Sequence, residues 1–322
     1  MPVFTYANPR VIHWGRGSVS HLAELMARRI AVVTTRSLRD RLDALPVRAA
    51  CVVVVGQHAP IGHVEAGVET VRGADAIVSF GGGSVIDAAK IISVKLDAIP
   101  HTAVPTTLSV AELAAGAGYT NEAGDKAGMR DPRLMVDTVI YDPELTLWTP
   151  LELWLSTGIR ALDHAVEGFL AEGEHPFNDV MALEAIRRLS SSLPRAKAAP
   201  SNLAVRSENQ LAAWFSFTLP GASAAGLSHV MGKQIGARYG IPHGVTSCLL
   251  LPHVMRYLGS SMPERMKSLP SADEVQELIG ALGLPQHIAA FGIGEPELRR
   301  AATELSGKHS ADDLLRIYLA AL

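Results

Sequence analysis

The sequence predicts a two-domain protein: an α/β domain with a doubly wound parallel sheet over residues 1–148, and an all-helical domain over residues 149–322. Three observations predict this architecture. A length of 322 residues favours about two domains. Short β-branched runs alternate with helical stretches as far as Pro143, as in parallel sheets whose strands are joined by helices. From Pro150 onward only helical periodicity remains.

The elements expected in the first domain follow this alternation. Residues 1–18 are interpreted as a short hairpin region, because Val11–Trp14 is strand-like and residues 15–17 are typical of a turn. A helix is expected over residues 19–29. The strands that follow are expected over residues 30–35, 51–56, 76–80, 102–105 and 138–142, and the helices over residues 63–72 and 84–95.

The second domain is punctuated by Pro and Gly, which indicate where one helix ends and the next begins. Its helices are expected over residues 151–172, 179–193, 205–217, 222–239 and 245–258, with further helical segments towards the C-terminus.

Charge and composition exclude several classes of protein. Lys+Arg 29 against Asp+Glu 32 leaves a net charge of −3 without a single-sign block, so no nucleic-acid partner is expected. The 48% hydrophobic and 19% charged residues are typical of a folded globular protein. No apolar run approaches the roughly 18 residues of a membrane span, and no secretion signal opens the chain, so no membrane partner is expected and the predicted location is cytoplasmic. Cys51 and Cys248 are expected to be core residues.

A glycine-rich turn joins the expected strand at residues 76–80 to the following helix. Glycines at 81–83 let the backbone turn sharply and approach a ligand. Ser84 is expected to cap the helix, with Asp87 at a capping-box spacing. The free N–H groups and positive dipole end of such a helix suit a pyrophosphate. A tight turn without a ligand is an equally good interpretation of the glycines alone.

Two further features support a nucleotide site. Thr106 and Thr107 directly follow an expected strand, at the carboxyl edge of the sheet where ligands of this architecture bind. Lys126, in a stretch rich in Gly and Asp, is placed to meet a phosphate. Taken singly, the threonines also suit an ordinary turn and the lysine a solvated surface.

Basic residues recur at helical spacing in the second domain. Arg160 and His164 share a helix face at i and i+4, as do His229 and Lys233, and His243 begins the next segment. Three histidines suit a divalent metal such as Zn²⁺ or Fe²⁺. However, an arginine stands one turn before the first histidine, and its guanidinium repels a cation. The neighbouring Asp163 lies about 100° away from His164 around the helix, and scattered core or surface histidines remain the alternative.

Together, these stretches resemble the iron-containing alcohol dehydrogenase family. The motifs occur in family order over nearly the whole chain, at residues 81–90, 104–107, 141–146, 158–167, 227–229, 241–244 and 250–255. The compact length and residues 126–133 are most similar to the maleylacetate reductase branch. The resemblance implies the fold shared with dehydroquinate synthase, with a nucleotide-binding N-terminal domain, a helical C-terminal domain and the active site in the cleft between them.

The resemblance also implies a nicotinamide cofactor, NADPH or NADH. It places the pyrophosphate at Gly82, Gly83 and Ser84, beside Asp87. Further cofactor contacts are implied for Thr106, Thr107 and Lys126. Many NAD-preferring members carry an Asp where this chain has Thr35, followed by Arg36. Because an acid there would repel a 2′-phosphate and Thr does not, NADPH is expected to be accepted.

The metal site departs from the family pattern. Metal-dependent members hold the ion with Asp, His, His and His, and by motif the Asp position is Arg160, whereas His164, His229 and His243 remain. A second family histidine, one turn after His229, is Lys233. No metal is therefore expected. Maleylacetate reductases resemble this chain in lacking the Asp and working without metal, although they usually carry a neutral residue there.

The predicted function is an NAD(P)H-dependent, metal-independent reductase of a carboxylate-bearing enone or oxo acid, similar to the reduction of maleylacetate to 3-oxoadipate in the breakdown of aromatic compounds. Arg160 is predicted to hold a substrate carboxylate bidentately. His229 or His243 would donate a proton, with His164 beside them. Lys233 would bind a second anion or act as the acid. The partners expected are a small anionic carboxylate substrate and a second copy of the chain, in a homodimer.

Three alternatives stay open at this point. One is a metal-dependent alcohol or aldehyde dehydrogenase on the three histidines. Another is a family member recruited to specialised metabolism with a different, even non-redox, reaction. The last is a nucleotide-binding regulatory protein without catalysis.

Overall fold

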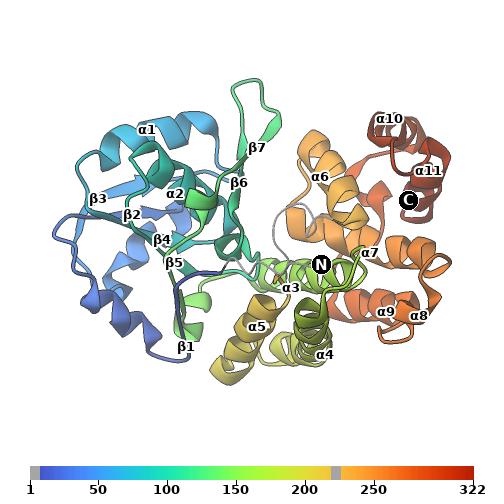
Figure 1. Cartoon of the computed structure of the whole chain (residues 1–322), viewed down its shortest axis with the longest axis horizontal. Helices are drawn as coiled ribbons and strands as arrows, with labels where there is room; N and C mark the ends of the chain where they lie inside the picture. The colour runs from blue at the N-terminus through green and yellow to red at the C-terminus, as the bar shows by residue number, and fades with distance from the viewer. Residues whose placement is uncertain (1–7, 219–225) are drawn as a thin grey trace. The chain divides into compact units, whose positions relative to one another are not determined.

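The computed structural model of the chain describes residues 8–218 and 226–322 (Figure 1). Its contacts divide the chain into two compact units. The first runs to Pro150 and also contains Pro200–Trp214, and the second comprises Leu151–Ala199 and Phe215–Leu322. The expectation that residues 200–214 belong to the second domain is therefore wrong, because this segment packs on the first unit through Arg206, whose Nη1 donates to the carbonyl of Thr146 over 2.9 Å.

The first unit is built on a six-stranded sheet in the order β1-β8-β5-β4-β2-β3, and every pairing in it is parallel. The predicted doubly wound parallel sheet is thus confirmed. The strands are β1 (Val11–Trp14), β2 (Ile30–Thr34), β3 (Ala49–Val54), β4 (Ala76–Gly81), β5 (His101–Pro105) and β8 (Thr138–Tyr141).

The alternation of side chains along the central strands explains why helices cover both faces of the sheet. In β2, Ala31 and Val33 belong to one apolar cluster, which also contains residues of α1 (Ile61–Val71) and α2 (Gly83–Lys95). Ile30 and Val32 belong to another cluster, with residues of the 3-10 helices η1 (Ser18–Glu24) and η2 (Arg36–Ala44). The sheet therefore buries apolar side chains on both faces.

The N-terminal region differs from the predicted hairpin. β1 pairs in parallel with β8, with Val11 opposite Thr138 and Trp14 opposite Tyr141. Gly17 adopts a left-handed conformation (φ 81°) and leads into η1, so no second strand can fold back here. The helix expected over residues 19–29 forms only as this 3-10 helix. Residues 1–7 of the expected hairpin region lie outside the described residues.

A two-stranded antiparallel sheet was not predicted. β6 (Gly116–Thr120) pairs with β7 (Lys126–Arg130) and packs against α2. The Gly- and Asp-rich sequence between them forms the connecting turn, which is why the region resembles a loop. Three short 3-10 helices complete this part of the chain: η3 (Ala111–Leu113), η4 (Pro132–Leu134) and η5 (Pro143–Thr146).

The second unit is helical, as predicted. Its first helix, α3 (Leu151–Phe169), is buried all round from Trp154 to its end and packs against α4, α6 and α7. The other helices after α3 are α4 (Pro176–Ala198), α5 (Leu203–Phe215), α6 (Leu227–Tyr239), α7 (His243–Gly259), α8 (Pro263–Met266), α9 (Ala272–Leu282), η7 (Ile288–Phe291), α10 (Glu295–Leu305) and α11 (Ala311–Ala320). Most of α5 belongs to the first unit. Residues 222–225 of the helix expected over 222–239 lie outside the described residues.

In residues 8–218 and 226–322, no helix combines the length and the apolar character needed to cross a bilayer.

Candidate active site

Two charged residues of α3 form a buried ion pair. Nη1 of Arg160 donates to Oδ2 of Asp163 over 3.0 Å, and the side chains are 4% and 0% exposed. The same Nη1 also donates to Oγ of Ser247 on α7, over 2.9 Å. Arg160 was predicted to hold a substrate carboxylate bidentately, and the structure shows that one of its terminal nitrogens, Nη1, is already bonded to two protein partners.

Asp163 was discounted in the sequence because it does not share the face of His164. The structure shows that the relevant spacing is i, i+3 from Arg160, which brings the two side chains together. Oδ2 of Asp163 also accepts hydrogen bonds from Ser228 (3.0 Å) and Ser247 (2.6 Å). Burial raises the pKa of this carboxyl, and the charge of Arg160 opposes the rise.

The three predicted histidines come together from three helices. His164 lies on α3 and is buried, His229 lies on α6 and is half-buried, and His243 is the exposed first residue of α7. Ring centroids are 5.7 Å apart for His164 and His229, and 5.2 Å apart for His229 and His243. Phe217 packs edge-on against His164, with a centroid distance of 5.0 Å. The cluster therefore runs from the interior of the unit to its surface.

Arg160 lies against this cluster at its exposed end. Its Nη2 is 3.4 Å from Nε2 of His243. Because a guanidinium only donates hydrogen bonds, this contact favours the tautomer in which Nε2 is the acceptor. Gly244 makes the approach possible, since a Cβ there would lie 2.8 Å from the carbonyl carbon and oxygen of Ser156 on α3. The glycine of the Pro-His-Gly motif thus lets α7 begin directly against the α3 backbone.

Glu167 is a member of the site that the sequence analysis missed. Its carboxylate accepts hydrogen bonds from the backbone N–H groups of Ser228 and His229, in the first turn of α6. The N-cap of α6 is Gly226, which has no side chain for this purpose, so the glutamate does the capping from α3. Burial raises the pKa of Glu167 well above its ordinary value, and the nearby Asp163 adds to the rise. The feature of the sequence that could have pointed to Glu167 is its charge, on a helix that is otherwise buried.

Lys233 is exposed and lies one turn beyond His229 on α6, as its spacing predicted. It is therefore accessible to an anion in solution, in contrast to the buried Arg160.

The donor set does not fit a metal ion. No three His, Cys, Asp or Glu side chains are grouped to hold one within the described parts of the chain. The guanidinium of Arg160 carries a positive charge into the histidine cluster and offers no lone pair. Oδ2 of Asp163, the nearest carboxylate oxygen to that guanidinium, already accepts three hydrogen bonds.

The predicted cofactor residues of the first unit lie at the carboxyl edge of the sheet. Thr34 pairs with Phe80 across β2 and β4, so Thr35 lies beside the turn that follows β4. Gly81 pairs with Pro105 across β4 and β5, which brings Thr106 to the same edge. The strand order reverses between β2 and β4, because the chain leaves β2 for β3 at the edge and returns to β4. Sheets of this kind bind ligands at such a point.

The glycine turn lies between β4 and α2, as predicted, but the predicted side-chain cap of α2 is not formed. Gly82 is the N-cap of α2 and makes no side-chain cap, so the expectation that Ser84 caps this helix is wrong. Oγ of Ser84 instead accepts a hydrogen bond from the N–H of His58 (2.9 Å). Asp87 accepts one from the N–H of Gly118 on β6 (3.0 Å), which replaces the expected capping box.

The fit of a phosphate to this turn rests on two observations. A Cβ at Gly82 would lie 2.9 Å from Cγ2 of Thr107, and one at Gly83 would lie 3.0 Å from Oγ of Ser109, so the loop after β5 closes over the glycines. Among the described residues, the buried hydroxyls of Thr107 and Ser109 have no hydrogen-bond partner. Uncapped helix N–H groups and unsatisfied hydroxyls at one place suit an anionic oxygen.

Lys126 is the first residue of β7, where it pairs with Thr120 and is half-buried. Burial lowers the pKa of His58, and the charge of Lys126 adds to this fall. Burial raises the pKa of Asp87 to about 6, a rise that Lys90 and, to a smaller extent, Lys126 oppose. His58 bonds to Ser84 in the first turn of α2 and Asp87 lies on the same helix, so the charge of Lys126 acts on residues around the predicted phosphate position.

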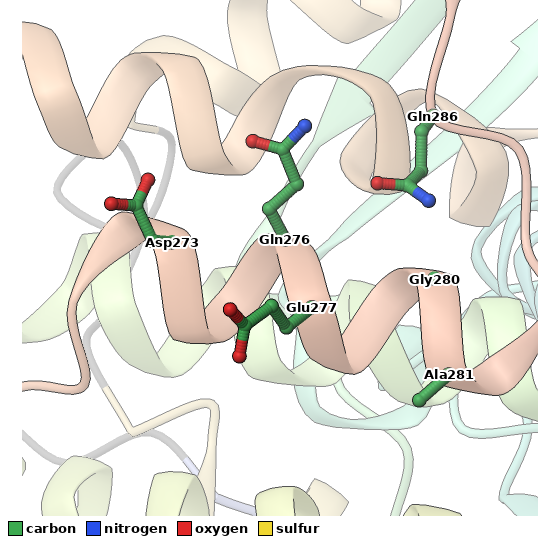
Figure 2. A pocket seen from close by; sticks show the side chains of 6 residues that line it. All are labelled: Asp273, Gln276, Glu277, Gly280, Ala281 and Gln286. Carbon is green, nitrogen blue, oxygen red and sulfur yellow. The ribbon is translucent and has the colours of Figure 1, made fainter.

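A separate hollow of about 410 Å³ lies on α9 of the second unit (Figure 2). It is lined by Asp273, Gln276, Glu277 and Gln286 together with two small residues, and Arg256 donates to Asp273 and Gln276. None of the site residues predicted from the sequence lines it.

Comparison with known proteins identifies the family. A model of the iron-containing alcohol dehydrogenases matches residues 9–143, and one of the C-terminal part of the Fe-containing alcohol dehydrogenase family matches residues 154–311. A maleylacetate reductase of Rhizobium sp. (strain MTP-10005) is 31% identical, over 92% of this chain and 88% of the relative. One from Sphingobium indicum is 34% identical over 76% of this chain and 72% of the relative.

Solved structures agree with this match. The crystal structure of a maleylacetate reductase from Agrobacterium tumefaciens superposes with a TM-score of 0.90 at 28% identity, covering 100% of this chain and 99% of that one. A 1,3-propanediol oxidoreductase superposes with a TM-score of 0.89 at 26% identity, with 100% of both chains covered. The chain is an oxidoreductase that belongs to the iron-containing alcohol dehydrogenase family, in its maleylacetate reductase branch.

Proposed function

We propose that the chain is an NAD(P)H-dependent reductase of a small carboxylate-bearing enone or oxo acid, similar to maleylacetate, and that it works without a bound metal. The observation that carries the proposal is the buried guanidinium of Arg160, 3.4 Å from His243, at the position where metal-dependent relatives carry an acidic ligand. The similarity to maleylacetate reductases supports the substrate class.

The cofactor would be held at the carboxyl edge of the first unit's sheet. Gly82, Gly83 and Thr107 would hold its pyrophosphate, and Lys126 would balance the negative charge. When bound, the nicotinamide supplies the hydride. Thr35, half-buried after β2, leaves room for a 2′-phosphate that an acidic side chain would repel, so NADPH would be accepted as well as NADH.

The residues of the second unit would stabilise the negative charge that develops on the substrate and would supply the proton that completes the reduction. Hydride addition to the alkene carbon remote from the ketone gives an enolate, with negative charge on the ketone oxygen. A proton must then be added to the other alkene carbon, the one next to the ketone. His229 or His243 would supply that proton, as imidazoles do near neutral pH. The positive charge of Arg160 would stabilise the enolate through the cluster, and the exposed Lys233 would attract a substrate carboxylate.

The test combines metal analysis with turnover. The purified protein is analysed for metal and assayed for NADPH oxidation with maleylacetate, before and after treatment with a chelator. Metal-free protein whose turnover is indifferent to the chelator would support the proposal. Metal-free protein without turnover would contradict the proposed substrate class but would still agree with a site that binds no metal.

A metal-dependent alcohol dehydrogenase is the second candidate. It is favoured by the three imidazoles, whose neighbouring ring centroids are 5.7 and 5.2 Å apart. One metal ion per chain, together with loss of activity on chelation, would select this candidate over the first.

A further inference from the structure

A single buried carboxylate oxygen connects the three helices that carry the histidines. Oδ2 of Asp163 accepts hydrogen bonds from Arg160 on α3, Ser228 on α6 and Ser247 on α7, at 3.0, 3.0 and 2.6 Å. All four residues are at least 97% buried, with exposures of 0%, 3%, 0% and 1%. The contacts therefore form a cross-link inside the unit.

Each of three residues in the cross-link lies next to, or one helical turn from, a histidine of the cluster. Asp163 precedes one histidine, Ser228 precedes another, and Ser247 follows the third by one helical turn. The three neighbouring pairs are Asp163 and His164, Ser228 and His229, and Ser247 and His243. Holding the aspartate and the two serines together thus holds the histidines together.

We propose that the Arg160–Asp163 pair is a built-in replacement for a metal ion in this site. Arg160 supplies the fixed positive charge beside the histidines, and Asp163 supplies the bonds that an ion would make between α3, α6 and α7. The inference rests on the proposed metal-free function, but it concerns how the site is assembled and is tested without substrate.

Charge and geometry explain why one residue of the pair needs the other. A buried guanidinium without a partner is costly, and so is a buried carboxylate, whereas the two together compensate each other's charge through Oδ2. Among the described residues, Oδ1 of Asp163 has no hydrogen-bond partner. Burial lowers the pKa of Arg160, and Asp163 and Glu167, which also caps α6, both oppose this fall. A divalent cation at the same place would face the guanidinium, so the pair and an ion exclude each other.

The first experiment measures metal binding. The variant Arg160→Asp/Asp163→Ala restores the Asp, His, His, His donor set and removes the pair. We expect it to bind about one Co²⁺ per chain, with a visible ligand-field absorption band and a higher Tm in the presence of Co²⁺. The unaltered protein is expected to show no band and no change in Tm with Co²⁺ or EDTA. A folded variant that binds no more Co²⁺ than the unaltered protein would overturn the proposal, and so would tight binding by the unaltered protein.

The second experiment tests the cross-link and does not depend on the first variant folding. Ser228→Ala and Ser247→Ala are each expected to lower the Tm, whereas Ser191→Ala, whose hydroxyl bonds within α4 at the surface, should not. In a cycle of Arg160→Met and Asp163→Asn, the double variant should be more stable than either single variant, because each single change leaves one buried charge unpaired. Additive effects in this cycle would overturn the proposal. Turnover is not measured, so failure here is distinct from failure of the proposed substrate class.

Discussion

Arg160 and Asp163 lie one turn apart on α3 and form an ion pair, with 3.0 Å between Nη1 and Oδ2 and side chains that are 4% and 0% exposed. Arg160 contacts Asp163 through Nη1 and lies 3.4 Å from Nε2 of His243 through Nη2, so the pair brings a positive group to the histidine cluster with its counter-charge attached. Arg160 is consequently a fixed charge with limited access to solvent. Its replacement is therefore expected to affect kcat more than KM.

Replacing Arg160 with Met should lower kcat by about 100-fold or more and change KM much less, because a preorganised charge acts on the developing enolate rather than on the bound ground state. The measurement is steady-state NADPH oxidation with maleylacetate. Arg188→Met, which removes a partly exposed ion pair on α4, is the control and should leave both constants near their original values. A steep rise in KM with kcat retained would show that Arg160 binds a substrate carboxylate after all.

His229 is the central ring of the cluster, with neighbours at 5.7 and 5.2 Å. His229→Gln should reduce kcat by about 100-fold, as expected when a general acid is lost. The pH profile of kcat should also lose a limb in the variant. His253→Gln, on α7 but not part of the cluster, should keep the original kcat and profile. Retention of kcat in His229→Gln would assign the proton to another residue.

The glycine turn offers a test of cofactor binding. A Cβ at Gly83 would lie 3.0 Å from Oγ of Ser109, so Gly83→Ala should displace the loop and weaken NADPH binding by about 10-fold. Binding can be followed by the fluorescence of NADPH without any substrate. Gly62→Ala on α1, where a Cβ meets nothing within 4 Å, is the matched control. Equal affinities for the two variants would argue against a phosphate at this turn.

Thr35 lies at the carboxyl end of β2, where the strand order reverses. Thr35→Asp should raise KM for NADPH by about 10-fold and leave KM for NADH nearly unchanged, because the new carboxylate repels only the 2′-phosphate. The two cofactors act as controls for each other in the same preparation. An equal rise for both would indicate a general disturbance of the sheet edge.

His101 couples the stability of the first unit to pH. It is 3% exposed, its Nε2 is 2.7 Å from Oγ of Ser79, and burial lowers its pKa to about 3, assisted by the charge of Lys90. The unfolded chain binds a proton at this residue below about pH 6.5, whereas the folded chain does so only near its lowered pKa. Stability contributed by the neutral ring should therefore be lost as the pH falls from about 6.5, by about 3 kcal/mol at pH 4.

The measurement for His101 is the free energy of unfolding between pH 7 and pH 4, obtained by denaturant titration. His101→Gln should flatten this dependence, because the glutamine cannot take up the proton. The half-buried His175→Gln is the control and should retain the original slope. An unchanged slope in the His101 variant would mean that other groups dominate the acid sensitivity.

Local patterns in the sequence determined much of the secondary structure of this protein and the position of its glycine turn. Short β-branched runs predicted the central strands β2, β4 and β5, because a strand buried on both faces must be apolar throughout. The spacing of Arg160 and His164 placed both on one helix, and the glycines after β4 marked the turn into α2. These features depend on residues within a few positions of one another, which is the range over which helix and strand periodicity acts.

The tertiary structure alone decided which distant residues meet. β1 joins β8 instead of forming a hairpin, and residues 200–214 pack on the first unit instead of the second. Asp163 receives its hydrogen bonds from Ser228 and Ser247, which are 65 and 84 residues away in the sequence. No local pattern encodes such contacts, because a buried carboxylate is satisfied by whichever donors the packing of the helices brings within about 3 Å.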